Sequence, residues 1–340
     1  MSYDLLPAAD TLLRDLMCLK KGEEVLITAD TKTDPRVPQA VFAMAEKLGA
    51  RAMISTGAQL PFQGSLADPY IPKALAGLVK TCDVWIDCTF PYLAGSHAHD
   101  EAMKTQRVRY MLGGDMDAGS FHRLFGEIDL DSYFAMQAAF DAVFREGRPC
   151  RITDPRGTDV SFTLAKSGLT KPRHADKPGM YLIPGTCSIA PKIETVKGQI
   201  VVTHSFHEFY EPLASLVTLT VDGPIRKVAG GGASRAPLER ALLRAGGGKY
   251  GSVIHFAQGM HPAARVTGTC FVEDIRAVGS NAVGLGIPWW EPGGGENHPD
   301  TVLTEQSVWV DGEKVIEHGQ VIGPKPLYEL ASKLAPLRRG

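Results

Sequence analysis

Apolar and polar positions along the first 150 residues follow two different periods in turn. Short apolar runs have the length and composition of buried strands at 23–30, 51–57 and 82–88. Helical periodicity follows in the intervening and later segments at 35–49, 70–80 and 128–147. Gly49 is placed to end the first of these helices. The succession of strands and helices predicts a parallel three-layer α/β domain over residues 1–148.

The pattern changes after Arg148, where short alternating segments with Pro and Gly turns predict a β-rich domain over residues 149–340. Asp311-Gly312 lies between two such segments and predicts a tight hairpin turn. Helices are expected only at 236–246 and at 326–337. The fold class that follows is α/β, with an N-terminal parallel three-layer domain and a β-rich C-terminal domain.

Composition excludes several classes of protein. Hydrophobic residues make up 44% and charged residues 22% of the 340 residues, and the net charge is −2, so neither a nucleic-acid footprint nor a basic membrane patch is expected. No apolar run is long enough to span a bilayer, and the N-terminus lacks the features of a signal peptide. The six cysteines are dispersed, which argues against a zinc ribbon or a disulfide scaffold. We therefore expect a cytoplasmic protein.

The first predicted strand is followed by ITADTKTDP rather than by a glycine-rich G-x-G-x-x-G turn. That turn supplies the close backbone approach to a pyrophosphate in dinucleotide-binding domains. A dinucleotide-binding function is therefore not expected.

Two potential metal ligands flank a proline in the segment GGENHPDTVL. Pro299 biases His298 toward an extended conformation, in which His298 and Asp300 point to the same face. The alternative is a His and an Asp on a surface turn.

A third potential ligand, His255, lies in the apolar segment SVIHFAQGM near the end of a predicted strand. Two histidines and one carboxylate leave coordination positions open and commonly hold non-haem Fe(II), although zinc hydrolases use the same set. The alternative for His255 is a hydrogen-bonded core histidine.

Other side chains are candidates for proton transfer or substrate contact. His97 and His99 follow the third predicted strand and could act as acid or base near neutral pH, unless Ser96 or Asp100 merely caps a helix there and both rings are solvated. Trp289 and Trp290 could stack on a planar ring or belong to the core. His207, in HSFHEFYEP, is expected in a polar loop, with substrate contact as a second interpretation, and Glu296 is a further candidate for substrate contact.

The C-terminal third carries a series of motifs in a recognisable order: HFAQGMHPAARVTG from 255, EDIRAVGSNAVGLG from 273, NHPD from 297 and VWVDGEKVIEHGQVI from 308. This series resembles the thermophilic metalloprotease (aminopeptidase T) superfamily. Within it, the chain resembles the 2,5-dihydroxypyridine 5,6-dioxygenase branch more than the peptidases.

The two branches of the superfamily differ in their metal ligands. The aminopeptidases use a two-metal site with a glutamate at the position of His255 and a histidine where this chain has Ala282. The dioxygenase branch has a His matching His255 and an H-x-D matching His298 and Asp300. A serine near the iron in that branch falls at about Gly284 here, so the fourth coordination position stays open, as does the substrate.

The resemblance implies a mononuclear non-haem Fe(II) dioxygenase that cleaves a hydroxylated pyridine or a related hydroxylated aromatic ring with O₂. His255, His298 and Asp300 would hold the iron, His99 or His97 would take the phenolic proton, and Trp289 or Trp290 would cover the ring. A homo-oligomer is expected from the resemblance alone. The alternative is a Zn- or Co-dependent aminopeptidase or amidohydrolase of the same superfamily, with Glu296 or Glu273 as the carboxylate beside the metal.

Overall fold

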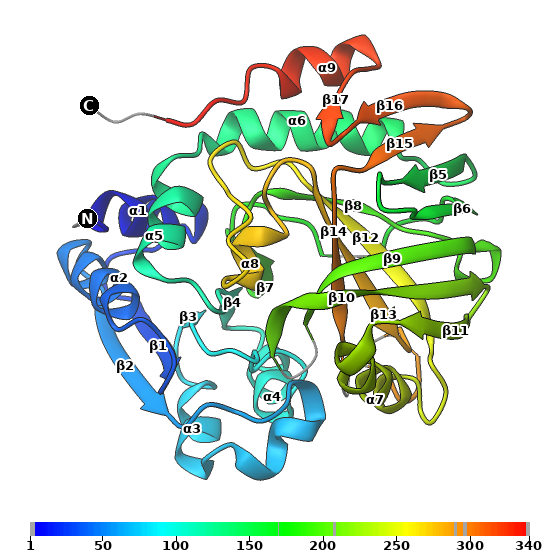
Figure 1. The fold of residues 1–340 in the computed structure, drawn as a ribbon. Coiled ribbons are helices and arrows are strands. Elements are labelled where there is room, and N and C mark those ends of the chain that lie inside the picture. Colours follow the sequence, from blue (N-terminus) through cyan, green and yellow to red (C-terminus); the bar gives the residue numbers. More distant parts are fainter. Residues whose placement is uncertain (1–3, 169, 207–208, 289–290, 295–297, 338–340) are drawn as a thin grey trace.

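The computed structural model describes residues 4–168, 170–206, 209–288, 291–294 and 298–337. Two sheets organise these residues, a parallel sheet and a larger curled antiparallel sheet (Figure 1). This arrangement confirms the expected fold class, in which a parallel α/β part is followed by a β-rich part.

The parallel sheet has the spatial order β2-β1-β3-β4-β7. The bounds of its strands are β1 Glu24–Asp30, β2 Arg51–Gly57, β3 Val84–Asp87, β4 Arg109–Leu112 and β7 Gly179–Leu182. Successive residues of β1 face opposite sides, since Val25 and Ile27 lie in one hydrophobic core and Leu26 lies in another. Burial of both faces explains why the inner strands are near-continuous apolar runs in the sequence.

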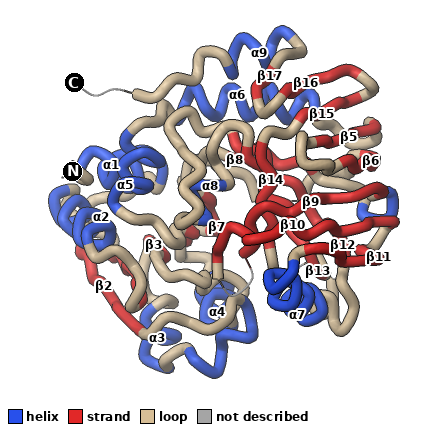
Figure 2. The backbone as a smooth tube through the Cα atoms, in the orientation of Figure 1, coloured by secondary structure: helices blue, strands red, loops and turns tan. Residues whose placement is uncertain are grey.

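Helices lie on both faces of this sheet. Their bounds are α1 Leu6–Asp10, α2 Arg36–Lys47, α3 Lys73–Leu78, α4 His97–Lys104, α5 Ala118–Phe121 and α6 Leu130–Val143, with the π-helical segments η1 Thr11–Leu16 and η3 His122–Gly126 and the 3₁₀ helix η2 Gly64–Tyr70. Val41 of α2 packs in the first core, whereas Ala102 of α4 packs in the second with Trp85 and Tyr110. Figure 2 shows helices α1 to α5 around the left and lower side of the molecule. The three-layer arrangement is thereby confirmed.

The antiparallel sheet follows the path β17-β16-β15-β5-β6-β9-β14-β13-β12-β8, and β10 and β11 extend it from β9. Its strands are β5 Pro149–Thr153, β6 Asp159–Thr163, β8 Thr186–Ile189, β9 Lys197–Phe206, β10 Tyr210–Asp222, β11 Ile225–Gly230, β12 Ser252–Gly259, β13 Ser280–Gly286, β14 Asp300–Thr304, β15 Ser307–Val310, β16 Glu313–Glu317 and β17 Gln320–Val321. The remaining elements are α7 Arg235–Ala245, α8 Phe271–Asp274, α9 Lys325–Ala331, η4 Ile193–Thr195 and η5 Gly232–Ser234. The helix predicted at 236–246 corresponds to α7, and the one predicted at 326–337 corresponds to α9, which ends earlier, at Ala331. The short helix α8 was not predicted.

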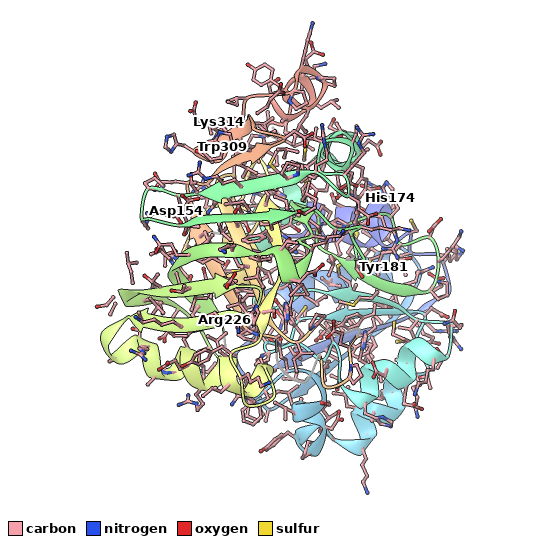
Figure 3. The ribbon with its side chains drawn as sticks, turned by 90° about the vertical axis from the view of Figure 1, so that its right-hand side faces the viewer. Asp154, His174, Tyr181, Arg226, Trp309 and Lys314 are labelled. Atoms are coloured by element: carbon pink, nitrogen blue, oxygen red, sulfur yellow. The ribbon has the colours of Figure 1, made fainter. Side chains whose placement is uncertain are left out.

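The predicted hairpin is present between β15 and β16. Asp311 and Gly312 both have positive φ, at 53° and 81°, as a two-residue type I′ turn requires. Beside the turn, the Lys314 ammonium lies 5.1 Å from the centroid of the Trp309 ring, and Figure 3 shows these two side chains together. This hairpin lies at the β17 end of the sheet path, away from the central strands that carry the site described below.

One strand links the two parts of the chain, because β7 follows residue 148 in sequence and pairs with β4 in the parallel sheet. The division into domains 1–148 and 149–340 stays a prediction. Within the described ranges, every helix is too short or too polar to cross a membrane.

Candidate metal centre

The three predicted ligands lie together on one face of the antiparallel sheet. His255 of β12 and Asp300 of β14 both pair with Gly284 of the intervening strand β13. Residues directly opposite one another in antiparallel strands carry their side chains on the same face. His298 lies two residues before Asp300, so its ring joins the other two side chains from the entry to β14.

The ligand atoms are close enough to share one ion. The two Nε2 atoms of His255 and His298 are 3.1 Å apart. The carboxylate oxygens of Asp300 lie 3.7 Å from His255 Nε2 and 3.8 Å from His298 Nε2. One potential ligand atom from each residue lies within 4.8 Å of the others. The predicted convergence of His298 and Asp300 on one face is therefore present in the fold, together with His255.

A β-bulge places His255 on this face. The pairing of β12 with β13 shifts between Val253 and His255, so that one extra residue, Ile254, stands in β12 before His255 comes to lie opposite Gly284. If the pairing continued regularly after Val253, Ile254 would lie opposite Gly284 and the His255 imidazole would point to the other side of the sheet. Bulges commonly redirect a side chain near a functional site.

The backbone of His298 is held from the N-terminal half of the chain. Gln63, which precedes η2 and is buried, donates a hydrogen bond from Nε2 to the carbonyl oxygen of His298 at 2.7 Å. The next carbonyl, that of Pro299, accepts a hydrogen bond from Leu285 N at 2.9 Å. Two consecutive peptide groups beside the ligand are thus fixed by different parts of the molecule.

Burial determines the protonation of the three side chains. Desolvation raises the pKa of Asp300 to about 8. Desolvation lowers the pKa of His298 to about 4, and desolvation together with the neighbouring His298 lowers that of His255 to about 3. At neutral pH and without a cation, the group therefore contains neutral imidazoles and a largely protonated carboxyl. The close His–Asp distances are not evidence of an ion pair under these conditions.

These residues fit a divalent metal ion. Neutral imidazoles are the form that binds a metal, and a cation stabilises the carboxylate that burial alone disfavours. Two nitrogen ligands at the usual bond length of about 2.1 Å and at right angles would lie about 3 Å apart, close to the observed separation of the two Nε2 atoms. Among the described residues, these three are the group of His, Cys, Asp and Glu side chains positioned to hold a metal.

Aromatic rings lie on the Asp300 side of the centre. Phe206 of β9 pairs directly with Asp300, and the Phe90 ring stacks on Phe206 with centroids 4.7 Å apart. Tyr92 and Phe271 also contact Phe206. The surrounding rings exclude water from the carboxyl, which accounts for part of its desolvation. Neither Phe206 nor Phe90 was predicted from the sequence to be part of the site.

The predicted acid–base candidates lie at the start of α4, in different environments. His97 is exposed, and its backbone N–H donates to Asp68 of η2. His99 is buried, 4.7 Å from Tyr110 and 6.2 Å from Trp85 between ring centroids, and its Nε2 is buried without a hydrogen-bond partner. Desolvation lowers the pKa of His99.

The 3₁₀ helix η2 connects this region with the metal ligands. Asp68, near its C-terminal end, accepts from His97 N, and Gln63, immediately before its N-terminal end, donates to the carbonyl oxygen of His298. At about 2 Å per residue, the two positions are roughly 10 Å apart along the turn. Ser96 caps this helix, as the alternative interpretation held, because its hydroxyl accepts from His99 N. That interpretation also expected both rings to be solvated, which is wrong for His99 because its ring is buried.

The remaining substrate-contact candidates lie outside the described residues. These are Trp289, Trp290, His207 and Glu296. Their assignments stay predictions.

A cavity of about 500 Å³ opens at the carboxyl end of the parallel sheet, and it is lined by residues that include Asp30, Gln59, Phe90, Asp115 and Tyr210. The three potential ligands do not line it. Phe90 lines this cavity and also stacks on Phe206, the residue that pairs with Asp300.

Two solved structures share this fold. The structure of 2,5-dihydroxypyridine dioxygenase from Pseudomonas putida KT2440 has a TM-score of 0.73 and 16% sequence identity, covering 96% of this chain and 100% of its own. Wild-type aminopeptidase T (AmpT) from Thermus thermophilus has a TM-score of 0.63 and 14% identity, covering 94% of this chain and 99% of its own. At these identities the likeness establishes the fold.

Comparison with curated protein sequences returned no match. The model of the family described as 2,5-dihydroxypyridine 5,6-dioxygenase (NicX), by contrast, matches residues 13–323. The match spans both sheets and all three potential ligands, and it confirms the resemblance inferred from the C-terminal motifs. The chain therefore belongs to the 2,5-dihydroxypyridine 5,6-dioxygenase family of ring-cleaving enzymes.

Proposed function

We propose that this protein is a mononuclear non-haem Fe(II) dioxygenase that opens a hydroxylated pyridine or a related hydroxylated aromatic ring with O₂. The observation that carries the proposal is the convergence of His255, His298 and Asp300 in a chain of this family. Two histidines and one carboxylate with open positions are typical of Fe(II) enzymes that use O₂. When bound, iron would supply a Lewis acid that acidifies a coordinated hydroxyl and activates O₂.

The residues of the chain have separate tasks in this proposal. Asp300, His255 and His298 hold the cation, and Gln63 keeps the His298 backbone in place. Phe206 and Phe90 keep water away from the Asp300 carboxylate, which strengthens its electrostatic interactions.

His99 is the proposed acceptor of the substrate's phenolic proton. Its lowered pKa keeps the imidazole neutral at pH 7, and a buried nitrogen without a partner is rare unless it serves a ligand or water. His97, the other candidate, is exposed and is less suited to this role because solvent competes for its ring.

The alternative is a Zn- or Co-dependent aminopeptidase or amidohydrolase, which the shared fold with AmpT brings into consideration. A second metal or a nearby carboxylate base would be needed. Glu273, one of the two candidates, is completely buried and forms a two-point contact with Arg123 while also accepting from Arg265 N. A carboxylate held in this way is poorly suited to bind a second metal, which favours the dioxygenase.

The first experiment is metal analysis of anaerobically purified protein, combined with oxygen uptake on a panel of hydroxypyridines. We expect about one iron per chain and O₂ consumption with at least one compound. The Asp300→Ala variant should lose the iron, whereas Glu313→Gln, which changes an exposed carboxylate on β16, should keep it. About two zinc or cobalt ions per chain without O₂ uptake would instead support the hydrolase.

We also propose that the protein is cytoplasmic and homo-oligomeric. The proposal rests on the dispersed cysteines and on the family resemblance. Light scattering during size-exclusion chromatography checks the second point, and a molar mass of a single chain would contradict it.

A further inference from the structure

Asp87, the last residue of β3, carries a completely buried carboxyl group that the proposed function does not use. Its Oδ1 accepts from Thr28 Oγ1 at 2.9 Å and from the backbone N–H and the hydroxyl of Thr89 at 3.1 and 2.7 Å. Its Oδ2 accepts from Leu93 N at 2.9 Å and from Tyr110 OH at 2.6 Å. All of these donors are neutral. A buried carboxyl group with neutral partners is costly, so its presence calls for an explanation.

The arrangement of donors suits the ionised form of this carboxyl group. Burial raises the pKa of Asp87, whereas the hydrogen bonds that it accepts lower it. Backbone N–H groups can only donate, and those of Thr89 and Leu93 point at different oxygens of the carboxyl. The Thr28 hydroxyl accepts from Trp85 Nε1 at 2.9 Å and therefore directs its own hydrogen to Asp87. Hydrogen bonding of this kind favours a carboxylate.

The same network holds the aromatic rings that pack on His99. Tyr110, which donates to Asp87, has its ring centroid 4.7 Å from that of His99 in a T-shaped arrangement. The centroid of the Trp85 ring is 6.2 Å from that of His99, and Trp85 is anchored to Asp87 through the Thr28 hydroxyl. Both aromatic rings are completely buried in the second hydrophobic core. The His99 ring therefore packs against side chains that Asp87 fixes.

Two carboxyl groups also act on the charge of the His99 imidazole. Asp100, the next residue of α4, has an oxygen 3.4 Å from His99 Nδ1, and Gly95 N donates to the same nitrogen at 3.3 Å. Desolvation lowers the pKa of His99, and the charges of Asp100 and Asp87 raise it. The Asp100 side chain is exposed, so solvent screens its charge. Asp87 acts through the protein interior, where charges are screened less.

We propose that Asp87 is a positioning residue for His99, which holds the imidazole through Tyr110 and Trp85 and stabilises its protonated form. The inference rests on the proposed function, in which His99 takes a proton from the substrate. In that step the O–H bond of the substrate hydroxyl breaks and an N–H bond forms at His99 Nε2, the buried nitrogen without a partner. Asp87 exchanges no proton. Its carboxylate compensates the positive charge that the buried imidazole gains.

The test measures the titration of His99 by NMR of metal-free protein with isotope-labelled histidines, and the His99→Gln variant identifies the signal. In Asp87→Asn the midpoint of this titration should fall, because removal of a negative charge destabilises the imidazolium. In iron-loaded Asp87→Asn, kcat should fall at least about tenfold, and its acid limb should move to lower pH. Iron content should stay unchanged, since Asp87 is not among the three potential ligands.

The matched control is Asp274→Asn. Asp274 of α8 is also completely buried, and it accepts from the Tyr210 hydroxyl at 2.7 Å and from backbone N–H groups. It is not among the groups that shift the pKa of His99. The control variant should therefore lower the thermal midpoint of the protein, as Asp87→Asn does, and leave the His99 titration as in wild type.

A wild-type His99 titration in folded Asp87→Asn would show that Asp87 supports only the fold. That result would overturn the inference and leave the proposed function intact. Absence of iron binding and O₂ uptake in the wild-type protein would instead overturn the proposed function, and the role of Asp87 in proton transfer with it.

If Asp87→Asn does not fold, Tyr110→Phe takes its place, because this variant keeps the ring and removes only the hydroxyl. The Asp87 carboxylate then loses its shortest hydrogen bond, which favours its protonated form. The His99 midpoint should again fall, together with kcat. A wild-type midpoint and wild-type kcat in Tyr110→Phe would overturn the inference.

Discussion

At the scale of single residues, burial determines what each histidine can do. His255 and His298 are kept neutral by desolvation, which suits ligands, and His99 is kept neutral beside aromatic rings, which suits a proton acceptor. His97 is only two residues from His99 but is exposed. The sequence gives no reason to choose between these two histidines, whereas the fold distinguishes them by burying only the His99 ring.

Replacing His99 by Gln should lower kcat roughly 10²- to 10⁴-fold, because the proposed proton acceptor is lost. Metal content should be unchanged, since His99 is not among the three ligands. The matched variant is His97→Gln, which alters an exposed ring on the same helix and should change kcat less than about twofold. The measurement is steady-state oxygen uptake by metal-loaded protein over a range of pH. Equal losses in the two variants would remove His99 from the mechanism.

At the scale of elements, the ligands depend on strand register and on one segment of the other half of the molecule. The bulge at Ile254 turns His255 toward Gly284, and the pairing of β13 with β14 brings Asp300 to the same row. Gln63, just before η2, then fixes the segment that leads into β14 by donating a hydrogen bond to the carbonyl oxygen of His298. The centre is thus assembled from strands β12 and β14, from the segment that leads into β14, and from Gln63, which lies 235 residues before His298 in the sequence.

Gln63→Leu should weaken metal binding roughly tenfold, because the His298 carbonyl loses its hydrogen-bond donor and the ligand loses support. The stability of the metal-free protein should change by only about 1 kcal/mol. Gln320→Ala, at an exposed position on β17, provides the control. Anaerobic metal titration and thermal unfolding give the two readouts. A large loss of stability with unchanged metal affinity would show that Gln63 supports the fold and not the ligand.

At the scale of the whole molecule, buried polar contacts join the two halves. His261 donates from Nε2 to the carbonyl oxygen of Leu124 in η3, and its Nδ1 accepts from the backbone N–H groups of Ala263 and Ala264. Arg123 of η3 pairs with the buried Glu273 of α8. His261 is thus a buried contact between the two halves.

Stability should consequently fall as the pH drops from 6.5 toward 4. Desolvation lowers the pKa of His261 to about 4 in the folded state, whereas an unfolded histidine titrates near 6.5. Between these values the unfolded chain binds the additional proton, so the free energy of unfolding rises with pH over this window. Above about pH 6.5, the contribution of His261 to the free energy of unfolding no longer changes with pH.

The check is denaturant unfolding of wild type and His261→Gln across this pH range. Between pH 4 and 6.5, the free energy of unfolding of wild type should rise with pH more steeply than that of His261→Gln, by up to about 1.4 kcal/mol per pH unit, which corresponds to one proton. Identical slopes would mean that His261 is accessible to protons in the folded state.

The sequence was sufficient for the types of element and for the chemistry of the ligands. The inner strands of the parallel sheet are buried on both faces, and for this reason continuous apolar runs in the sequence predicted them. Asp311-Gly312 predicted its hairpin because few residues adopt positive φ. Pro299 predicted the extended segment that places His298 and Asp300 on one face, since proline restricts its predecessor.

The convergence of the ligands was decided only by the tertiary structure. The bulge at Ile254 determines which side of the sheet His255 faces, and a register shift of one residue leaves no clear trace in the residue types. The role of Gln63 appears only when the two halves of the chain meet. Local sequence determines backbone preferences and side-chain chemistry, whereas a metal centre requires distances between residues far apart in the chain, which packing alone sets.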